Sequence, residues 1–430
     1  MKIFLISGDF PSGTHTVRAA NRVLDALILE LLDRGHEIAL QVISATDLDP
    51  AFTLPETPKR LTLLPPFQRK DYFREAAGAN VFKLSSRLVS RITNPIEFFY
   101  HASILRSAID ERIRKAGSDV ALIFWNSDGL AATFGNHRVP KIAYYGMPDH
   151  ESSLARLEDR ELFGLKMSSA SLALERQNLK SWESAHIALM KDCDVVTNLC
   201  ADHARYYQNH GHARSLYVPN IWPEAATSTR PGAEIVRPAG KVRIFGNMGR
   251  LSATGNTYGL KYIGEELCPR LDKVLGSDGY EIHILGGGTP IPAVAKALTH
   301  PSIRLRGWVE DIDAEIMAAD VFLVANNTGR YRGAHTRFLH GWSLKACCVA
   351  HSYNAQAMPE MRHGENVLLG ETPDEIVSLI VTAAADPQLR ARIGNAGWKT
   401  YQKYFTPKAV VVHLEREMMV LLEEKGSVAR

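Results

Sequence analysis

The chain has 430 residues, of which 45% are hydrophobic and 23% charged, a composition typical of globular proteins with more than one buried core. Its 50 basic and 47 acidic residues leave a formal charge of +3, too small for a dedicated nucleic-acid binder, so we predict no nucleic-acid partner. The five cysteines are scattered, without C-x-x-C spacing, which indicates neither a disulfide framework nor a zinc site. Because no apolar run suits a signal peptide or a membrane span, we expect a cytoplasmic protein.

The first half of the chain alternates predicted strands and helices. A strand over Lys2–Ser7 is followed by a polar turn, a helix that ends at Gly35 and a second strand over Glu37–Ile43. This order predicts a parallel sheet with a crossover connection, and hence a doubly wound domain over residues 1–220. Further strands are predicted near Leu61, at 120–125, at 141–145, near Val195 and at 215–220.

The second half repeats this alternation after a stretch rich in Pro, Gly and Ala. Residues 221–240 are interpreted as a linker, and residues 241–405 as a second Rossmann-like domain. Thr406 as N-cap and Pro407 at the first helical position predict a C-terminal helix over residues 406–430. Packing of this helix back onto the N-terminal domain is one option.

Five short segments of the second half follow one another in a characteristic order. They are GNMGRLS at 246–252, HILGGG at 283–288, RGWVED at 306–311, AADVFLVA at 318–325 and PEMRHGENVLL at 359–369. In this order they resemble the C-terminal domain of the retaining group 1 glycosyltransferases. DRGHE at 33–37 and VPN at 218–220 are similar to segments of the family's N-terminal half.

The resemblance implies an α/β fold of two Rossmann-like, doubly wound domains facing a cleft, the GT-B fold. It implies transfer of a sugar from a nucleotide-sugar donor to a sugar, glycolipid or other small acceptor, with retention and without a cofactor. The family's commonest setting is the assembly of cell-surface polysaccharide or glycoconjugates. A non-catalytic nucleotide-sugar scaffold and a nucleotide-sugar epimerase of the same fold remain alternatives.

The resemblance assigns Arg250 to the donor diphosphate, where its positive charge would stabilise the departing nucleotide, a catalytic role. The matched positions in the neighbouring loops, predicted to contact the donor, are Gly249, Gly286, Gly287 and Val309. A lysine usually follows a few residues after the arginine, but here residues 253–256 are Ala, Thr, Gly and Asn. A surface loop arginine is the alternative interpretation of Arg250.

A second departure from the family lies in the stretch from Arg332, where Arg332 and His340 replace the family's two glutamates. The resemblance implies that a helix begins here with its first amides pointing at the donor phosphates. We expect Arg337 to replace the missing lysine and His340 to bond a ribose hydroxyl, although a partly buried polar helix is the alternative. The predicted donor-binding residues of this stretch are Gly333, His335, Thr336, Arg337 and His340.

In the N-terminal half, the turn over residues 7–16 follows the first strand, where Gly13 would let the backbone approach the donor. A plain connecting loop explains the turn almost as well. After the strand at 141–145, Asp149 and His150 are the candidates for catalytic residues near the transferred sugar. Gly146 is the alternative occupant of the family's histidine position.

Two D-x-D strings, at 47–49 and 311–313, are interpreted as a loop and as the N-cap Asp311 of a following helix, so we predict no metal. The stretch from Lys59 to Lys115 holds 12 basic and 5 acidic residues with interleaved aromatic ones. It predicts either peripheral contact with anionic lipid head groups or ordinary solvated helix faces with core aromatics.

Overall fold

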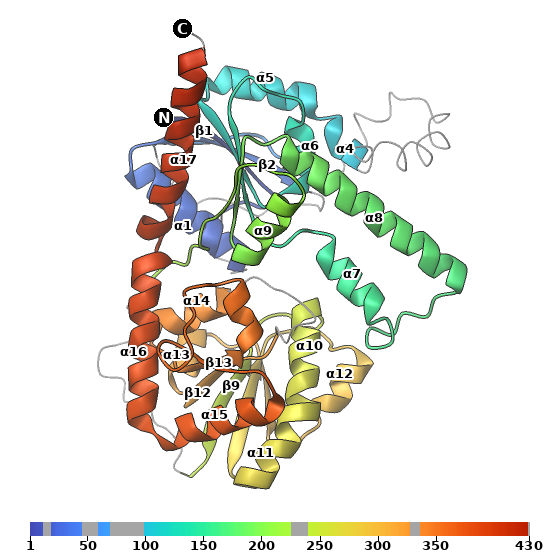
Figure 1. Ribbon diagram of the computed structural model, residues 1–430, viewed down its shortest axis with the longest axis vertical. Helices are drawn as coiled ribbons and strands as arrows, with labels where there is room; N and C mark the ends of the chain where they lie inside the picture. The colour runs from blue at the N-terminus through green and yellow to red at the C-terminus, as the bar shows by residue number, and fades with distance from the viewer. Residues whose placement is uncertain (12–18, 45–58, 69–98, 225–239, 327–335, 429–430) are drawn as a thin grey trace. The chain divides into compact units, whose positions relative to one another are not determined.

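The computed structural model describes residues 1–11, 19–44, 59–68, 99–224, 240–326 and 336–428 (Figure 1). The chain forms two compact units. Unit 1 contains residues 1–151, 168–223 and 407–430, and unit 2 contains residues 152–167 and 224–406. The sequence analysis assigned residues 152–167 to the N-terminal domain, whereas they group with unit 2 here.

Unit 1 is built on a parallel sheet of eight strands in the order β3-β2-β1-β5-β6-β7-β8, with β4 paired to β2. The strands are β1 (Lys2–Ser7), β2 (Glu37–Ser44), β3 (Leu61–Leu63), β4 (Phe67–Gln68), β5 (Val120–Phe124), β6 (Lys141–Tyr145), β7 (Val195–Asn198) and β8 (Ser215–Tyr217). Strands β5 and β6 are buried along their whole length, as expected for central parallel strands covered on both faces.

Helices cover this sheet on both faces, because right-handed crossovers place helices on opposite sides once the strand order reverses at β1. Helix α6 packs against α4, α5 and α8, and α1 packs against α17 (Figure 1). The described helices of unit 1 are α1 (Ala19–Asp33), α4 (Tyr100–Ser103), α5 (Arg106–Ala116), α6 (Ser127–Thr133), α8 (Ser169–Lys191), α9 (Ala201–Asn209) and α17 (Pro407–Val428).

The C-terminal helix α17 is held to unit 1 by burial and by charge. Its apolar side is buried at Val411, Leu414, Met418 and Leu421. Glu415 accepts a hydrogen bond from Arg34 Nε at 2.8 Å, and its other oxygen lies 2.9 Å from His36 Nε2. The last helix in the sequence therefore completes the N-terminal unit.

Unit 2 is a second parallel sheet, in the order β11-β10-β9-β12-β13-β14. Its strands are β9 (Val242–Asn247), β10 (Tyr280–Leu285), β11 (Ile303–Gly307), β12 (Val321–Val324), β13 (Cys348–His351) and β14 (Leu368–Gly370). The strand order reverses between β9 and β12. The carboxyl ends of strands at such a reversal are where open α/β sheets bind ligands.

The described helices of unit 2 are α10 (Thr254–Tyr262), η3 (Ile263–Leu267), α11 (Cys268–Leu275), α12 (Pro292–Ala297), α13 (Ile312–Met317), α14 (Thr336–Ser343), η4 (Ser352–Gln356), α15 (Pro373–Ala385) and α16 (Pro387–Tyr404). Helix α7 (Glu151–Glu158) begins at the last residue of the first segment of unit 1 and continues into unit 2. Tyr258 on α10 fixes this segment, since its hydroxyl donates to the Ala155 carbonyl at 3.1 Å and to Asp159 Oδ2 at 2.6 Å.

Two local predictions of the sequence analysis are confirmed in this fold. Asp311 is the N-cap of α13 and accepts a hydrogen bond from the Ala314 amide at 2.9 Å. Helix α17 begins at Pro407.

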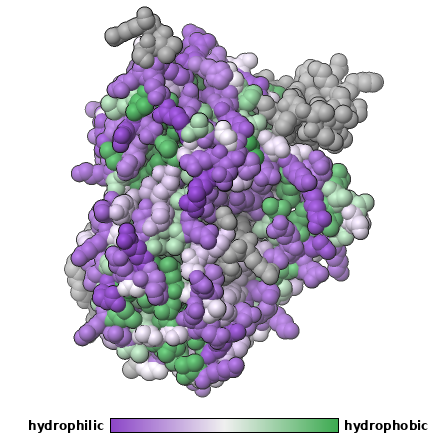
Figure 2. All heavy atoms as spheres, in the orientation of Figure 1, coloured by the Kyte–Doolittle hydropathy of each residue, from purple (hydrophilic) through white to green (hydrophobic). Residues whose placement is uncertain are grey.

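The surface shown in Figure 2 is mostly hydrophilic, with scattered apolar patches. Among the described residues, every helix is too short or too polar to cross a membrane. Of the basic stretch at 59–115, residues 69–98 lie outside the described part. Where it is described, Phe99 is buried and the Arg112 guanidinium lies 4.1 Å from the Phe67 ring centre, which agrees with core and surface packing.

Candidate functional site

Three glycine-containing loops meet at the carboxyl ends of β9, β10 and β11. Gly249 and Gly286 have φ angles of 96° and 129°, and a Cβ at Gly286 would lie 1.8 Å from the Gly249 carbonyl oxygen. Only glycine fits there. The Leu251 amide donates to the Gly287 carbonyl at 3.0 Å, and the Gly286 amide to the Gly307 carbonyl at 2.8 Å. The loops therefore form one hydrogen-bonded backbone surface.

Arg250 stands in the first of these loops with its side chain exposed. Helix α10 begins just beyond it at Thr254, and the N-cap residue Ala253 supplies no side-chain hydrogen bond. The first turn of α10 contains no acidic residue. The start of a helix offers backbone amides and the positive end of the helix dipole, and here an exposed guanidinium lies beside it. Together these groups suit an anion such as a diphosphate.

Arg337 on α14 forms hydrogen bonds to the loop that carries Arg250. Its guanidinium donates to Asn247 Oδ1 at 3.0 Å, to the Met248 carbonyl at 2.6 Å and to the Asn256 side-chain oxygen. Asn256 in turn donates to the Arg250 carbonyl at 2.7 Å. Burial lowers the pKa of Arg337 to about 10, so the group stays cationic near neutral pH. The structure thus places a positive charge against the stretch where the family's lysine is missing.

His340 lies deeper in α14, only 3% exposed. Its Nε2 is 2.6 Å from Asp313 Oδ1, so one nitrogen of the ring is engaged by a carboxylate from α13. The sequence analysis considered Asp313 only as part of a D-x-D string and missed this pairing. The Asp313 carboxylate thus lies next to His340, the residue that stands at the position of the family's second glutamate.

The other predicted donor residues of unit 2 are placed as follows. Thr336 opens α14 and is partly exposed, and Val309 follows β11 and is also partly exposed. Its neighbour Trp308, which sequence reasoning did not select, is 82% exposed directly after the Gly307 contact. Gly13, Gly333 and His335 lie outside the described residues.

The corresponding edge of unit 1 begins with a strained residue. Trp125 follows β5 with a φ of 39°, a conformation that is rare for a bulky side chain and that often marks functional sites. A Cβ at Gly146 would lie 2.4 Å from the Trp125 ring. Gly146 is therefore needed for close packing against the indole. Asn126 then caps α6 by accepting from the Gly129 amide at 3.0 Å.

Asp149 belongs to a buried polar network made of Ser127, Tyr145, Asp149, His186 and Tyr207. Tyr145 donates to Asp149 Oδ2 at 2.9 Å, and Ser127 Oγ donates to the same oxygen. His186 lies 3.5 Å from Ser127 through Nδ1 and 2.7 Å from the Tyr207 hydroxyl through Nε2. Burial raises the pKa of Asp149 and lowers the pKa of His186 to about 3. The groups of this network satisfy one another inside the unit.

His150 is also turned inward, with 3% of its surface exposed. Its Nε2 lies 3.6 Å from Glu183 Oε1, and its ring is next to those of His186 and Tyr206. Burial lowers the pKa of His150. The structure brings the two predicted residues Asp149 and His150 to one edge of unit 1, with side chains that face the interior.

The structure shows the surroundings of one of the two D-x-D strings, at 311–313. Residues 47–49 lie outside the described part of the chain. Asp311 caps α13 and Asp313 meets His340, so both carboxylates have protein partners.

The architecture of the two units is typical of one class of protein. Two parallel Rossmann-like sheets in one chain, with the candidate anion site at the strand-order reversal of the second, are the architecture of GT-B glycosyltransferases. Residues 242–386, within unit 2, match the family model of glycosyl transferases group 1. No curated protein matches the chain.

Solved structures of the same fold extend over the whole chain. Sucrose-phosphate synthase from Thermosynechococcus elongatus is 14% identical with a TM-score of 0.63, over 98% of this chain and 99% of that one. Trehalose 6-phosphate synthase from Burkholderia multivorans is 10% identical with a TM-score of 0.64, over 100% and 98%. HepE from Anabaena, in complex with UDP and glucose, is 14% identical with a TM-score of 0.56, over 97% and 99%. The predicted GT-B fold is confirmed, and the predicted enzyme class, a glycosyltransferase, is supported.

Proposed function

We propose that the chain transfers a sugar from a nucleotide-sugar donor held by unit 2 to a sugar-containing acceptor. The observation that carries the proposal is the joined glycine loops with the exposed Arg250 beside the open start of α10. Backbone donors and a cation at one place suit the diphosphate of a nucleotide-sugar. The UDP and glucose named with the HepE structure agree with this donor class.

In the proposed reaction, the bond between the anomeric carbon and the diphosphate oxygen breaks while the acceptor oxygen bonds to that carbon. The acceptor proton passes to the leaving phosphate. Arg250 and the first amides of α10 stabilise the charge that develops on the nucleotide diphosphate, which is the main catalytic contribution required of unit 2. The chemistry proceeds with retention and requires no metal ion.

Arg337 has a positioning role in this proposal. It fixes the loop that carries Arg250 through Asn247, the Met248 carbonyl and Asn256, and it adds a fixed positive charge. The pair of His340 and Asp313 takes the place of the family's second glutamate toward the donor ribose. The acceptor binds to unit 1, and the product belongs to a cell-surface polysaccharide or glycoconjugate.

The test is calorimetric titration of the full chain with UDP, GDP, ADP and TDP, followed by donor turnover with the sugar nucleotides of the base that binds. We expect one nucleotide to bind selectively and its sugar to be transferred or slowly hydrolysed. Arg250→Ala is expected to weaken nucleotide binding and to slow turnover by about 10²–10³. Selective binding without any turnover would instead support the non-catalytic scaffold, and no binding at all would reject the donor site.

A further inference from the structure

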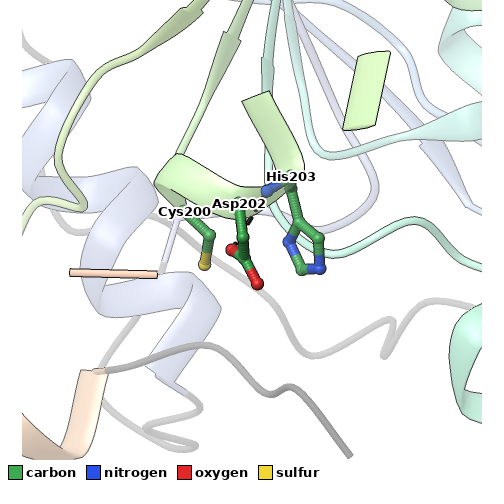
Figure 3. A group of neighbouring side chains, drawn as sticks. All are labelled: Cys200, Asp202 and His203. Carbon is green, nitrogen blue, oxygen red and sulfur yellow. Dashed lines mark hydrogen bonds between the residues drawn. The ribbon is translucent and has the colours of Figure 1, made fainter. Parts of the chain in front are cut away.

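A cluster of side chains with metal-binding atoms lies at the start of α9 in unit 1. Cys200, Asp202 and His203 project from the same side of its first turn (Figure 3). One ligand atom from each lies within 4.8 Å of the other two, and all three residues are buried. Within the described part of the chain, this is the one such group of three metal-binding side chains.

A fourth donor comes from the loop after β6. Glu151 Oε2 lies 3.3 Å from His203 Nε2. Glu151 follows directly on Asp149 and His150, and it opens α7. A thiol, an imidazole and two carboxylates thus converge from the segments that follow two neighbouring parallel strands, β6 and β7.

The His203 imidazole gives an independent indication of a ligand. The residue is 1% exposed, and its Nε2 faces Glu151 Oε2 at 3.3 Å, while its buried Nδ1 has no hydrogen-bond partner. A buried polar group without a partner is destabilising by about 1–3 kcal/mol. Such a group in a native structure calls for a partner, and a bound ion is one of the usual ones.

We propose that Cys200, Asp202, His203 and Glu151 bind a structural zinc ion. Zinc bonds of about 2.0–2.3 Å in a tetrahedron place the ligand atoms roughly 3–4 Å apart, so donors within 4.8 Å reach one ion by small side-chain rotations. Thiolate, imidazole and carboxylate ligands together are typical of zinc rather than of magnesium or calcium. Four protein ligands close the coordination sphere, the pattern of a structural site.

Binding balances without any other reactant. The Cys200 thiol and the protonated His203 ring each release a proton to solvent, and the thiolate and the imidazole then each donate an electron pair to the ion. With the two carboxylates the site carries one net negative charge. The Asp202 carboxylate already accepts from the His203 amide at 3.0 Å, which orients the ligand turn. The ion would join the start of α9 to the start of α7, beside Asp149 and His150.

The sequence pattern is C-x-D-H, residues 200–203, with the glutamate 49 positions earlier. A search for C-x-x-C spacing does not find it, because only one ligand is a cysteine. The proposal concerns a structural ion in unit 1 and is independent of the proposed donor site in unit 2.

The test uses the full chain, purified with zinc and dialysed against metal-free buffer, and measures metal content by mass spectrometry. We expect about one zinc per chain. Replacement by Co²⁺ should give thiolate-to-cobalt charge-transfer absorption and intense visible bands of tetrahedral cobalt. Cys200→Ala should lose the charge-transfer band and bind zinc at least about 100-fold more weakly.

Cys193→Ala is the matched control, since Cys193 is also a buried cysteine of unit 1, it lies outside the cluster, and its Sγ donates to the Leu189 carbonyl at 3.9 Å. The control should keep both signals. If Cys200→Ala does not fold, His203→Gln, which is similar in size, decides the question by the same loss of zinc. Metal-free protein with an unchanged melting temperature in zinc, or equal cobalt spectra in the Cys200 and Cys193 variants, would overturn the proposal.

Discussion

The carboxyl edges of the two sheets have the same topology and opposite character. In unit 2 the edge is made of glycine backbone, and it leaves Arg250 exposed next to an open helix start. In unit 1 the edge is filled with side chains, and Asp149, His186 and their partners bond to one another in the interior. The first edge therefore suits the proposed binding of an anion, whereas the polar groups of the second bond to one another.

This contrast indicates how the two edges respond to mutation. A change in unit 2 should act mainly on ligand binding and turnover, because the polar groups there include an exposed cation. A change in the Asp149–His186 network of unit 1 should act mainly on stability and its pH dependence, because the groups of that network are buried and bond to one another.

The largest effect is expected from Arg250→Ala. Removing the exposed cation should lower kcat by about 10²–10³, comparable with the loss of one donor that stabilises an oxyanion, while the melting temperature stays unchanged. The measurement is steady-state transfer or donor hydrolysis with the sugar nucleotide selected by calorimetry. Arg392→Ala, an exposed arginine on α16 of the same unit, serves as the control. Equal activity of Arg250→Ala and wild type would remove the anion site from this edge.

Arg337→Met should affect stability and ligand binding together. The substitution leaves the acceptors of Asn247, Met248 and Asn256 without their donor, at a cost of about 1–3 kcal/mol in the free energy of unfolding. Urea unfolding and nucleotide titration measure the two effects. Arg337→Lys keeps the charge without the planar fork, so it should recover part of the affinity and little of the stability. A stable Arg337→Met protein with normal affinity would show that the loop does not depend on this contact.

The buried polar network predicts an acid-sensitive unit 1. Burial, followed by the nearby His150, lowers the pKa of His186 from 6.5 to about 3, so the unfolded chain binds a proton at a pH where the folded chain does not. The stability from this group is present above pH 6.5 and is lost as the pH falls toward 3, by up to about 1.4 kcal/mol per pH unit. The neighbours that modulate it are Ser127, Tyr145, Tyr207 and Asp149. The raised pKa of Asp149 acts in the opposite sense, favouring the folded state at low pH.

His186→Gln should reduce this acid dependence in urea unfolding measured between pH 7 and 4. His137→Gln, on the surface of the same unit with a 69% exposed side chain, should leave the pH profile as in wild type. Identical profiles for wild type and His186→Gln would mean that His186 does not stay neutral in the folded state.

The sequence predicted the two sheets well because their signals are local. Hydrophobic runs, glycine turns and caps such as Asp311 are read from neighbouring residues, and the structure confirms them. The partners within the candidate sites depend on contacts across the fold, which spacing does not encode. The contact of Arg337 with Asn256 spans 81 positions and that of Asp149 with Ser127 spans 22. The inward orientation of His150 could not be read from its place after a strand, because burial depends on α8 and α9 packing over it.

The smallest effect is expected from a change at Trp308, on the carboxyl edge of the unit 2 sheet. Trp308 is 82% exposed at the end of β11, one residue beyond the carbonyl that bonds Gly286. An exposed indole at the edge where a nucleotide is proposed to bind offers a stacking surface for the base, worth about 1 kcal/mol or more. Trp308→Ala should weaken nucleotide binding about fivefold to tenfold without changing the melting temperature, and Trp308→Phe should restore most of the affinity. Leu305→Ala, which removes another exposed apolar side chain of β11, should leave the affinity unchanged. If both alanine variants bind the nucleotide like wild type, the base lies away from β11, and recognition at this edge is confined to the diphosphate.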